Sequence, residues 1–101
     1  MGQVVGFIFV SRARFGRQGQ YVELDNMQVS RPWRAQGMGK QLFGLACAAA
    51  RALDVRKLYI SAQPSEETQA FYRGLGCVEA QEIDPVSAER EPLDVPLEYV
   101  L

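Results

Sequence analysis

Two glycines, Gly37 and Gly39, stand one residue apart where a strand-like segment passes through a loop into a helix-like one. Because glycine has no Cβ atom, the backbone amides around it can approach a ligand closely. A helix N-terminus adds N–H groups and a partial positive charge, which suit a phosphate or pyrophosphate. Arg34 and Lys40 place two cations beside this turn. The segment therefore predicts an anion-binding loop, although a strand–helix turn that binds nothing explains two glycines equally well.

Other phosphate-binding motifs fit this segment less well. A nucleoside-triphosphate P-loop needs Ser or Thr after its Gly-Lys pair, but Gln41 follows Lys40. A dinucleotide-binding fingerprint needs a third glycine where Leu42 stands. The sequence contains no histidine, which removes the commonest general base, the Ser/His and Cys/His nucleophilic arrangements and any histidine-based metal site.

Composition bounds the class of protein. The 101 residues predict a single domain, 1–101, and 48% hydrophobic with 23% charged residues is a globular composition. A net charge of −1 gives no general attraction to nucleic acid or to anionic membranes. Cys47 and Cys77 lack CxxC spacing, which argues against a zinc site and favours a reducing compartment. No apolar run of about 20 residues and no signal-peptide pattern is present, so we expect a soluble, cytoplasmic protein without a metal.

Hydrophobic spacing predicts the elements that position the loop. Apolar residues recurring every three or four positions predict helices, and β-branched or aromatic runs predict strands. The predicted order is β-β-α-β-α-β-β, with strands at 3–10, 21–29, 57–62, 77–83 and 95–101 and helices at 37–53 and 65–76. The first strand is either buried on both faces or a strong edge, and a polar loop precedes the last one. Strand–helix–strand connections make the two middle strands parallel, so the fold class is mixed, α+β or α/β.

Two stretches carry a resemblance to a known family. Residues 29–42, VSRPWRAQGMGKQL, resemble the acetyl-CoA-binding motif V-x-P-x-[YFW]-R-x-x-G-x-G-x-x-L of the GNAT superfamily of N-acetyltransferases, with the proline displaced by one to Pro32. Residues 65–77, SEETQAFYRGLGC, resemble the family's N-x-x-A-x-x-F-Y-x-x-x-G-F. The resemblance covers about residues 4–101. The residues in register are Val29, Trp33, Arg34, Gly37, Gly39, Leu42, Phe71, Tyr72 and Gly76.

The resemblance implies a site for acetyl-CoA as co-substrate. The loop and helix start would hold its pyrophosphate, and the strand before the loop would pair with the pantetheine arm where the two middle strands splay apart. Ser65 stands where the family often has an Asn that contacts CoA, although a helix N-cap also explains it. Arg34 either contacts phosphate or fixes the loop through a carboxylate. The implied cofactor-binding residues are Met27, Gln28, Val29, Arg34, Gln36, Gly37, Met38, Gly39, Lys40 and Ser65.

The resemblance also implies acid and base groups for a metal-free transfer of acetyl to a primary amine. Tyr72 would protonate the departing thiolate, because a phenol with a pKa near ~10 is protonated at neutral pH. Ordinary core packing is the alternative for Tyr72. A carboxylate on strand 21–29 would take the amine proton, and Glu23 and Asp25 share one face by strand alternation unless a bulge intervenes. A solvated or salt-bridged carboxylate is the alternative for each.

The family's fold begins with a strand, two helices and a further strand before the segment that matches residues 4–10, and those helices form much of the acceptor site. Only residues 1–3 precede that segment here. The strand VVGFIFV would then present an unpaired apolar edge, for which a homodimer, a partner chain or the rest of a longer protein would provide cover. The functions left open are an N-acetyltransferase, a catalytically incomplete acyl-CoA-binding module that acts through dimerisation or a partner chain, and a structural dimerisation domain.

Overall fold

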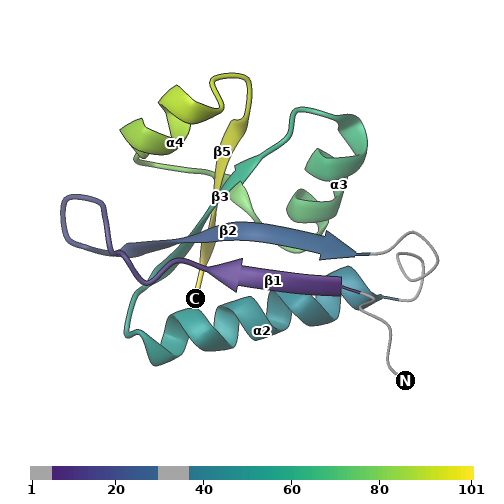
Figure 1. Cartoon of the computed structure of the whole chain (residues 1–101), viewed down its shortest axis with the longest axis horizontal. Coiled ribbons are helices and arrows are strands. Elements are labelled where there is room, and N and C mark those ends of the chain that lie inside the picture. The colour runs from purple at the N-terminus through teal and green to yellow at the C-terminus, as the bar shows by residue number, and fades with distance from the viewer. Residues whose placement is uncertain (1–5, 30–36) are drawn as a thin grey trace.

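The fold is a mixed sheet with helices on both faces. The computed structural model describes residues 6–29 and 37–101. Over these ranges the strands form one five-stranded sheet in the order β1-β2-β3-β5-β4 (Figure 1). The elements are β1 (Gly6–Val10), β2 (Tyr21–Val29), α2 (Met38–Ala52), β3 (Lys57–Ala62), α3 (Glu66–Gly74), β4 (Val78–Glu79), α4 (Pro85–Arg90) and β5 (Val95–Val100). The predicted mixed α+β class is confirmed.

Strand pairing follows the predicted directions at the centre of the sheet. β1 pairs antiparallel with β2, and β2 runs parallel to β3. β5 inserts antiparallel between β3 and β4. β1 is therefore an edge strand among the described strands, with alternating exposed and half-buried residues rather than burial on both faces.

The parallel pair β2 and β3 stays together only at its beginning. Their register covers Tyr21–Glu23 against Lys57–Tyr59, and the strands diverge beyond that point (Figure 1). The pairing of β2 with β1 also changes here, because Val10 lies opposite Leu24 whereas Phe9 lies opposite Asn26. Asp25 is the extra residue of this β-bulge, and a bulge interrupts the alternation of faces.

The core lies between the sheet and α2 with α3. α2 runs along β1 and β2, with α3 and α4 on either side of β3 (Figure 1). The core cluster includes Val22, Leu24, Leu58 and Ile60 from the strands, together with Phe43 and other residues of α2. Because side chains alternate along a strand, Tyr21, Glu23 and Tyr59 point to the opposite face, where α4 packs. This layering leaves Glu23 between the sheet and α4.

Two segments near the C-terminus differ from the prediction. The expected strand 77–83 is short, Val78–Glu79, because the amide of Gln81 bonds a side chain, Glu98, instead of continuing the β5 ladder. The expected polar loop contains a helix, α4. Asp84 caps α4 by accepting a hydrogen bond from the Val86 amide at 3.3 Å, and Pro85 occupies the first turn. A capping Asp followed by Pro was the available signal for this helix.

Candidate functional site: a cleft between diverging strands

A cleft of about 870 Å³ opens where β2 and β3 separate. Side chains of β2 and β3 line its floor, and α3, α4 and the segment after α4 line its walls. The register between β2 and β3 ends at Glu23, and β2 continues along the cleft as an extended strand. An extended strand can form strand-like hydrogen bonds with an extended, amide-containing ligand. The predicted site residues that line the cleft are Glu23, Asp25, Met27, Gln28, Gly39, Ser65 and Tyr72.

The predicted pyrophosphate loop is described only in part. Arg34 and Gln36 lie outside the described residues, and of Val29 only the backbone, which lies opposite Gly6 of β1, is described. Gly37, Met38 and Lys40 lie at the start of α2, next to Gly39, which reaches the cleft. The structure therefore brings the start of α2 to the cleft, and the pyrophosphate-binding role of this segment stays a prediction.

The two glycines meet different structural needs. Gly37 precedes α2 with φ of 76°, a left-handed conformation in which a side chain is strained. Gly39 lies against α3, because a Cβ atom there would be 3.0 Å from the Phe71 ring. Gly39 thus allows α2 and α3 to approach at the end of the cleft. Both roles are compatible with backbone amides that face a ligand, which was the sequence-based expectation.

Tyr72 joins the core to the cleft. Its ring packs against Phe43 of α2 with ring centroids 6.1 Å apart and against Phe71 at 5.1 Å, and the side chain also lines the cleft. Burial, with a smaller effect of the Cys77 thiol, raises the pKa of Tyr72 to about 12. The phenol is therefore a proton donor at neutral pH. Core packing and a position on the cleft are both true of this residue.

The two predicted base candidates differ in environment. Glu23 is buried, and burial raises the pKa of its carboxyl, while the Ser87 hydrogen bond and the Arg90 charge partly oppose that rise. The Ser87 hydroxyl donates to Glu23 Oε1 at 2.7 Å, and Arg90 Nη2 lies 3.8 Å from Oε2. Asp25 is the exposed bulge residue. A buried carboxyl with a raised pKa suits a general base near neutral pH better than an exposed one.

Ser65 has the structural role that its alternative reading predicted. It precedes α3 as the N-cap, and its hydroxyl accepts a hydrogen bond from the Thr68 amide at 3.3 Å. Glu66 and Glu67 follow in the first turn, where the helix dipole favours negative charge. Because Ser65 also lines the cleft, capping does not exclude a ligand contact.

Sequence reasoning missed the wall that α4 provides. Ser87 is buried against Glu23, and Arg90, Glu91 and Asp94 line the cleft. Ser61 of β3 holds the last of these, since its hydroxyl donates to Asp94 Oδ2 at 3.0 Å. Ser87, Arg90, Glu91 and Asp94 fall in the segment that the sequence predicted to be a loop. The Asp84–Pro85 pair at the start of α4 was the sequence signal that a helix begins there.

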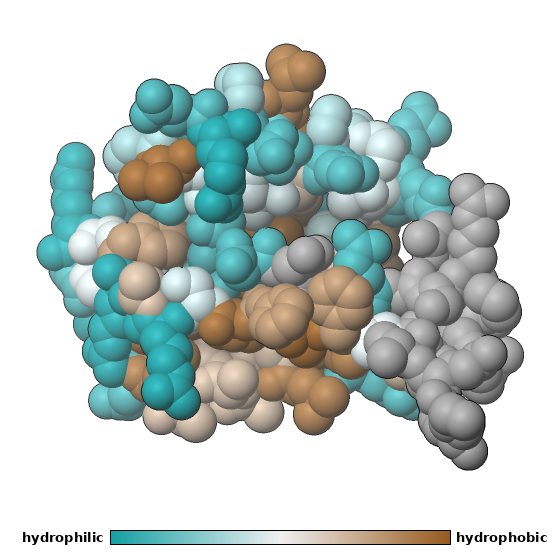
Figure 2. Space-filling model, viewed as in Figure 1, coloured by the Kyte–Doolittle hydropathy of each residue, from teal (hydrophilic) through white to brown (hydrophobic). Residues whose placement is uncertain are grey.

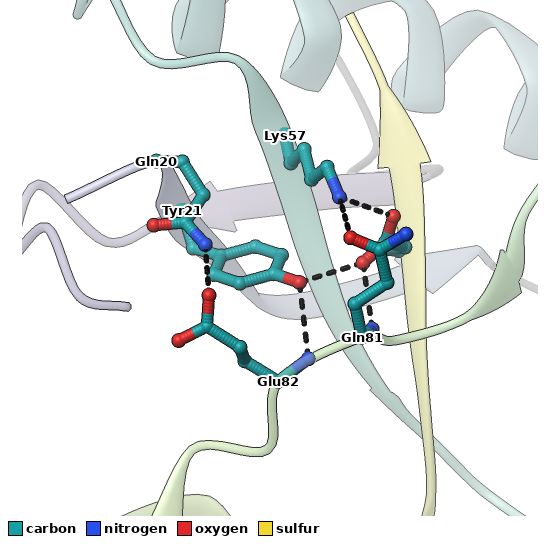
Figure 3. Close-up of polar contacts among 6 residues, drawn as sticks. Gln20, Tyr21, Lys57, Gln81 and Glu82 are labelled. Atoms are coloured by element: carbon teal, nitrogen blue, oxygen red, sulfur yellow. Dashed lines mark hydrogen bonds and ion pairs between the residues drawn. The ribbon is translucent and has the colours of Figure 1, made fainter. Parts of the chain in front are cut away.

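A buried polar network anchors the segment that leads into α4 (Figure 3). Glu98 of β5 accepts hydrogen bonds from the Tyr21 hydroxyl at 2.6 Å and the Gln81 amide at 2.9 Å, and Lys57 Nζ lies 2.8 Å from its other oxygen. Burial acts to raise the pKa of Glu98, but these donors together lower it. Glu82 accepts hydrogen bonds from the Arg17 amide and from Gln20, so the segment is also tied to the connection between β1 and β2.

Three further observations concern the described part of the chain. None of its helices is long and apolar enough to cross a membrane. Over residues 6–29 and 37–101, no group of three or more His, Cys, Asp or Glu side chains is arranged to hold a metal ion. Cys47 and Cys77 are buried free thiols.

One family model matches most of the chain, and similar solved structures share the fold. The family model described as Acetyltransferase (GNAT) family matches residues 1–77. One similar solved structure is a GNAT acetyltransferase of Staphylococcus aureus Mu50, with a TM-score of 0.74 and 20% identity, and the match covers 96% of this chain and 60% of that one. Another is the IAA acetyltransferase of Bacillus cereus, with a TM-score of 0.73 and 22% identity, and the match covers 100% of this chain and 73% of that one. A GNAT acetyltransferase of Elizabethkingia anophelis with acetyl-CoA bound is also similar, with a TM-score of 0.71 and 18% identity, and the match covers 98% of this chain and 70% of that one. A search of curated proteins found no match. The chain thus spans about 60% of the length of the S. aureus protein.

Proposed function

The chain belongs to the GNAT acetyltransferase family, and from this premise we propose that it transfers the acetyl group of acetyl-CoA to a primary amine. The observation that carries the proposal is the cleft between β2 and β3, which places a buried carboxyl, Glu23, and a protonated phenol, Tyr72, in one cavity. Reaction of an amine with a thioester needs a proton acceptor and a proton donor. The cleft contains candidates for both roles.

The residues around the cleft fit the binding of acetyl-CoA. The stretch of β2 at Met27, Gln28 and Val29 would bond the amides of the pantetheine arm, and the turn from Gln36 to Lys40 would hold the pyrophosphate, with Arg34 and Ser65 as further contacts. The divergence of β2 from β3 after Glu23 and the position of Gly39 at the cleft support this arrangement. Bound in this way, acetyl-CoA supplies the activated acetyl thioester.

The acid and base roles follow from the environments of the two groups. Glu23 would accept the proton of the amine nitrogen that attacks the acetyl carbon. Tyr72 would donate its proton to the sulfur of the departing CoA. The raised pKa of Glu23 and the pKa of about 12 at Tyr72 support these directions of transfer. Asp25 remains a second candidate for the base, because it also lines the cleft.

The charge of the cleft supports a positively charged acceptor. Among the described lining residues the carboxylates are Glu23, Asp25, Glu67, Glu91 and Asp94, and the one basic side chain is Arg90. Negative potential in a cleft raises the local concentration of cations. An amine that carries a positive charge before it reacts would be attracted to this wall.

A second chain and a cytoplasmic setting are also part of the proposal. Phe7 and Phe9 of the edge strand β1 are 38% and 59% exposed, and Figure 2 shows apolar side chains gathered over β1 and along α2. An exposed apolar strand at a sheet edge favours association, here with a second copy or a partner chain. The buried free thiols support a reducing compartment.

An assay of turnover tests the proposed transfer. Acetyl-CoA is incubated with a panel of amines, and free CoA thiol and acetylated amine are both measured. We expect amine-dependent release of thiol in equal amount to the acetylated product. Binding of acetyl-CoA without turnover on any amine would replace the proposal with the alternative of a catalytically incomplete acyl-CoA-binding module. Absence of both would contradict any role in acetyl-CoA chemistry.

A further inference from the structure

Ser87 lies between two carboxyl groups. Its Oγ is 2.7 Å from Glu23 Oε1 and 3.0 Å from Asp84 Oδ2, and the side chain is buried, with 1% of its surface exposed. A serine hydroxyl has one proton to donate, whereas an ionised carboxylate can only accept. If both carboxyls are ionised, one of these two short contacts therefore lacks a proton.

One added proton satisfies both contacts. A protonated Glu23 can donate to Ser87 Oγ, and the hydroxyl then turns its own proton toward Asp84. The arrangement thus has hydrogen-bond partners for either form of Glu23, including the protonated form that a general base reaches after it accepts a proton. Asp84 is half-buried, so it lies nearer to solvent than Ser87 does.

We propose that Ser87 and Asp84 form a proton relay with Glu23, in which the Ser87 hydroxyl turns between the two carboxyls according to which of them holds the proton. The proton that Glu23 accepts passes to Ser87 Oγ as the Ser87 proton passes to Asp84, so that Glu23 is ionised again and Asp84 carries the proton until water removes it. Ser87 and Asp84 are positioning residues that act through Glu23. The relay rests on the proposed function only for its use in catalysis.

Other groups also face Glu23 and contribute to its titration. Arg90 of α4 lies 3.8 Å from its carboxylate, Asp25 follows on the same strand, and Tyr59 lies opposite it on β3. The charges of Asp84 and Asp25 act to raise the pKa of Glu23, and that of Arg90 acts to lower it. These through-space effects do not require the Ser87 hydroxyl, which gives a way to separate them from a relay.

A double-mutant cycle on the protein without ligand tests the relay. The carbon-13 NMR signal of the Glu23 carboxyl, assigned with Glu23→Gln, is followed against pH in the wild type, Asp84→Asn, Ser87→Ala and the double variant. Asn is also a good N-cap, so Asp84→Asn retains the start of α4. Removal of the Asp84 charge is expected to lower the Glu23 pKa. A relay predicts a clearly smaller shift when Asp84→Asn is made in the Ser87→Ala variant.

Equal shifts in the wild-type and Ser87→Ala backgrounds would overturn the relay, because charge alone would then explain the coupling. If Ser87→Ala does not fold, Ser87→Cys retains the shape with a weak donor and should reduce the coupling in the same way. Ser61→Ala breaks a second Ser–Asp pair of the cleft and should leave the Glu23 pKa unchanged.

In a transferase assay, Ser87→Ala should lower kcat by about tenfold, with a changed pH profile. Failure of that assay with intact NMR coupling would contradict the proposed function and not the relay.

Discussion

The ring of Tyr72 packs in the core while its side chain also lines the cleft, and this burial raises its pKa. The aromatic neighbours Phe43 and Phe71 remove the ring from water, and burial raises the pKa to about 12. The phenol therefore stays protonated throughout the neutral pH range. A tyrosine in this environment can donate a proton and has little tendency to accept one.

Removal of the Tyr72 hydroxyl tests this role. Tyr72→Phe is expected to lower kcat for thiol release by about 100-fold with unchanged affinity for acetyl-CoA, because the ring that packs in the core is retained. Kinetics and calorimetry measure the two quantities. Tyr99→Phe is the matched control, since Tyr99 also packs on Phe43, at 5.2 Å, but does not line the cleft. Unchanged turnover in Tyr72→Phe would remove Tyr72 from the mechanism.

The protonation of Glu23 predicts the acidic side of the pH profile. Because burial raises the pKa of Glu23, kcat/KM should fall as the pH decreases through that raised value, where the carboxyl becomes protonated and cannot accept a proton. Glu23→Gln should lose this dependence and about 10²- to 10⁴-fold in rate. Asp25→Asn should retain this fall of kcat/KM in acid. If Asp25→Asn loses the pH dependence and Glu23→Gln retains it, the base is Asp25 and not Glu23.

At the scale of the elements, the Glu98 network joins β2, β3 and β5 and orients the segment before α4. Glu98 is 2% exposed and is paired with Lys57, so removal of its charge leaves a largely buried cation without its partner. Glu98→Gln is expected to lower the free energy of unfolding by about 3 kcal/mol in urea at neutral pH. Glu79→Gln breaks the exposed pair with Arg73 and should change the free energy of unfolding by less than about 0.5 kcal/mol.

The stabilisation by Glu98 should depend on pH in a direction that its lowered pKa determines. Since the pKa of Glu98 is lowered in the folded state, its contribution to stability is present above the ordinary carboxyl pKa and is lost as the pH falls through the lowered value. The difference between the wild type and Glu98→Gln should therefore shrink in acid. A difference that stays constant down to low pH would contradict the proposed charge pairing.

Local patterns predicted the elements better than the contacts between them. The helical spacing of residues 37–53 and the runs 21–29 and 57–62 depend on neighbouring residues, and the structure confirms α2, β2 and β3 there. The bulge at Asp25 depends on how β1 pairs with β2, and the partners of Glu98 depend on β5 inserting beside β3. Such contacts join residues up to 77 positions apart, so they can be predicted only after the order and pairing of the strands are known. The six-residue α4 is too short for a periodic signal.

At the scale of the whole molecule, the exposed strand β1 predicts self-association. The rings of Phe7 and Phe9 lie 5.5 Å apart on the surface of an edge strand. We expect light scattering at micromolar concentration to give a dimeric mass, and Phe9→Ser to shift it toward the 11.3 kDa monomer. Val78→Ser, at an exposed position of β4 on the opposite edge, should leave the mass unchanged. A monomeric mass for the wild type would contradict the association.

The central claim is that acetyl-CoA occupies the cleft between β2 and β3. Titration of the labelled protein with acetyl-CoA, followed by the backbone amide NMR signals, tests it most directly. The claim predicts saturable shifts at Met27, Gly39, Ser65 and Tyr72, with β4 unaffected. Unchanged spectra at saturating ligand concentration, or shifts confined to residues away from the cleft, would contradict it.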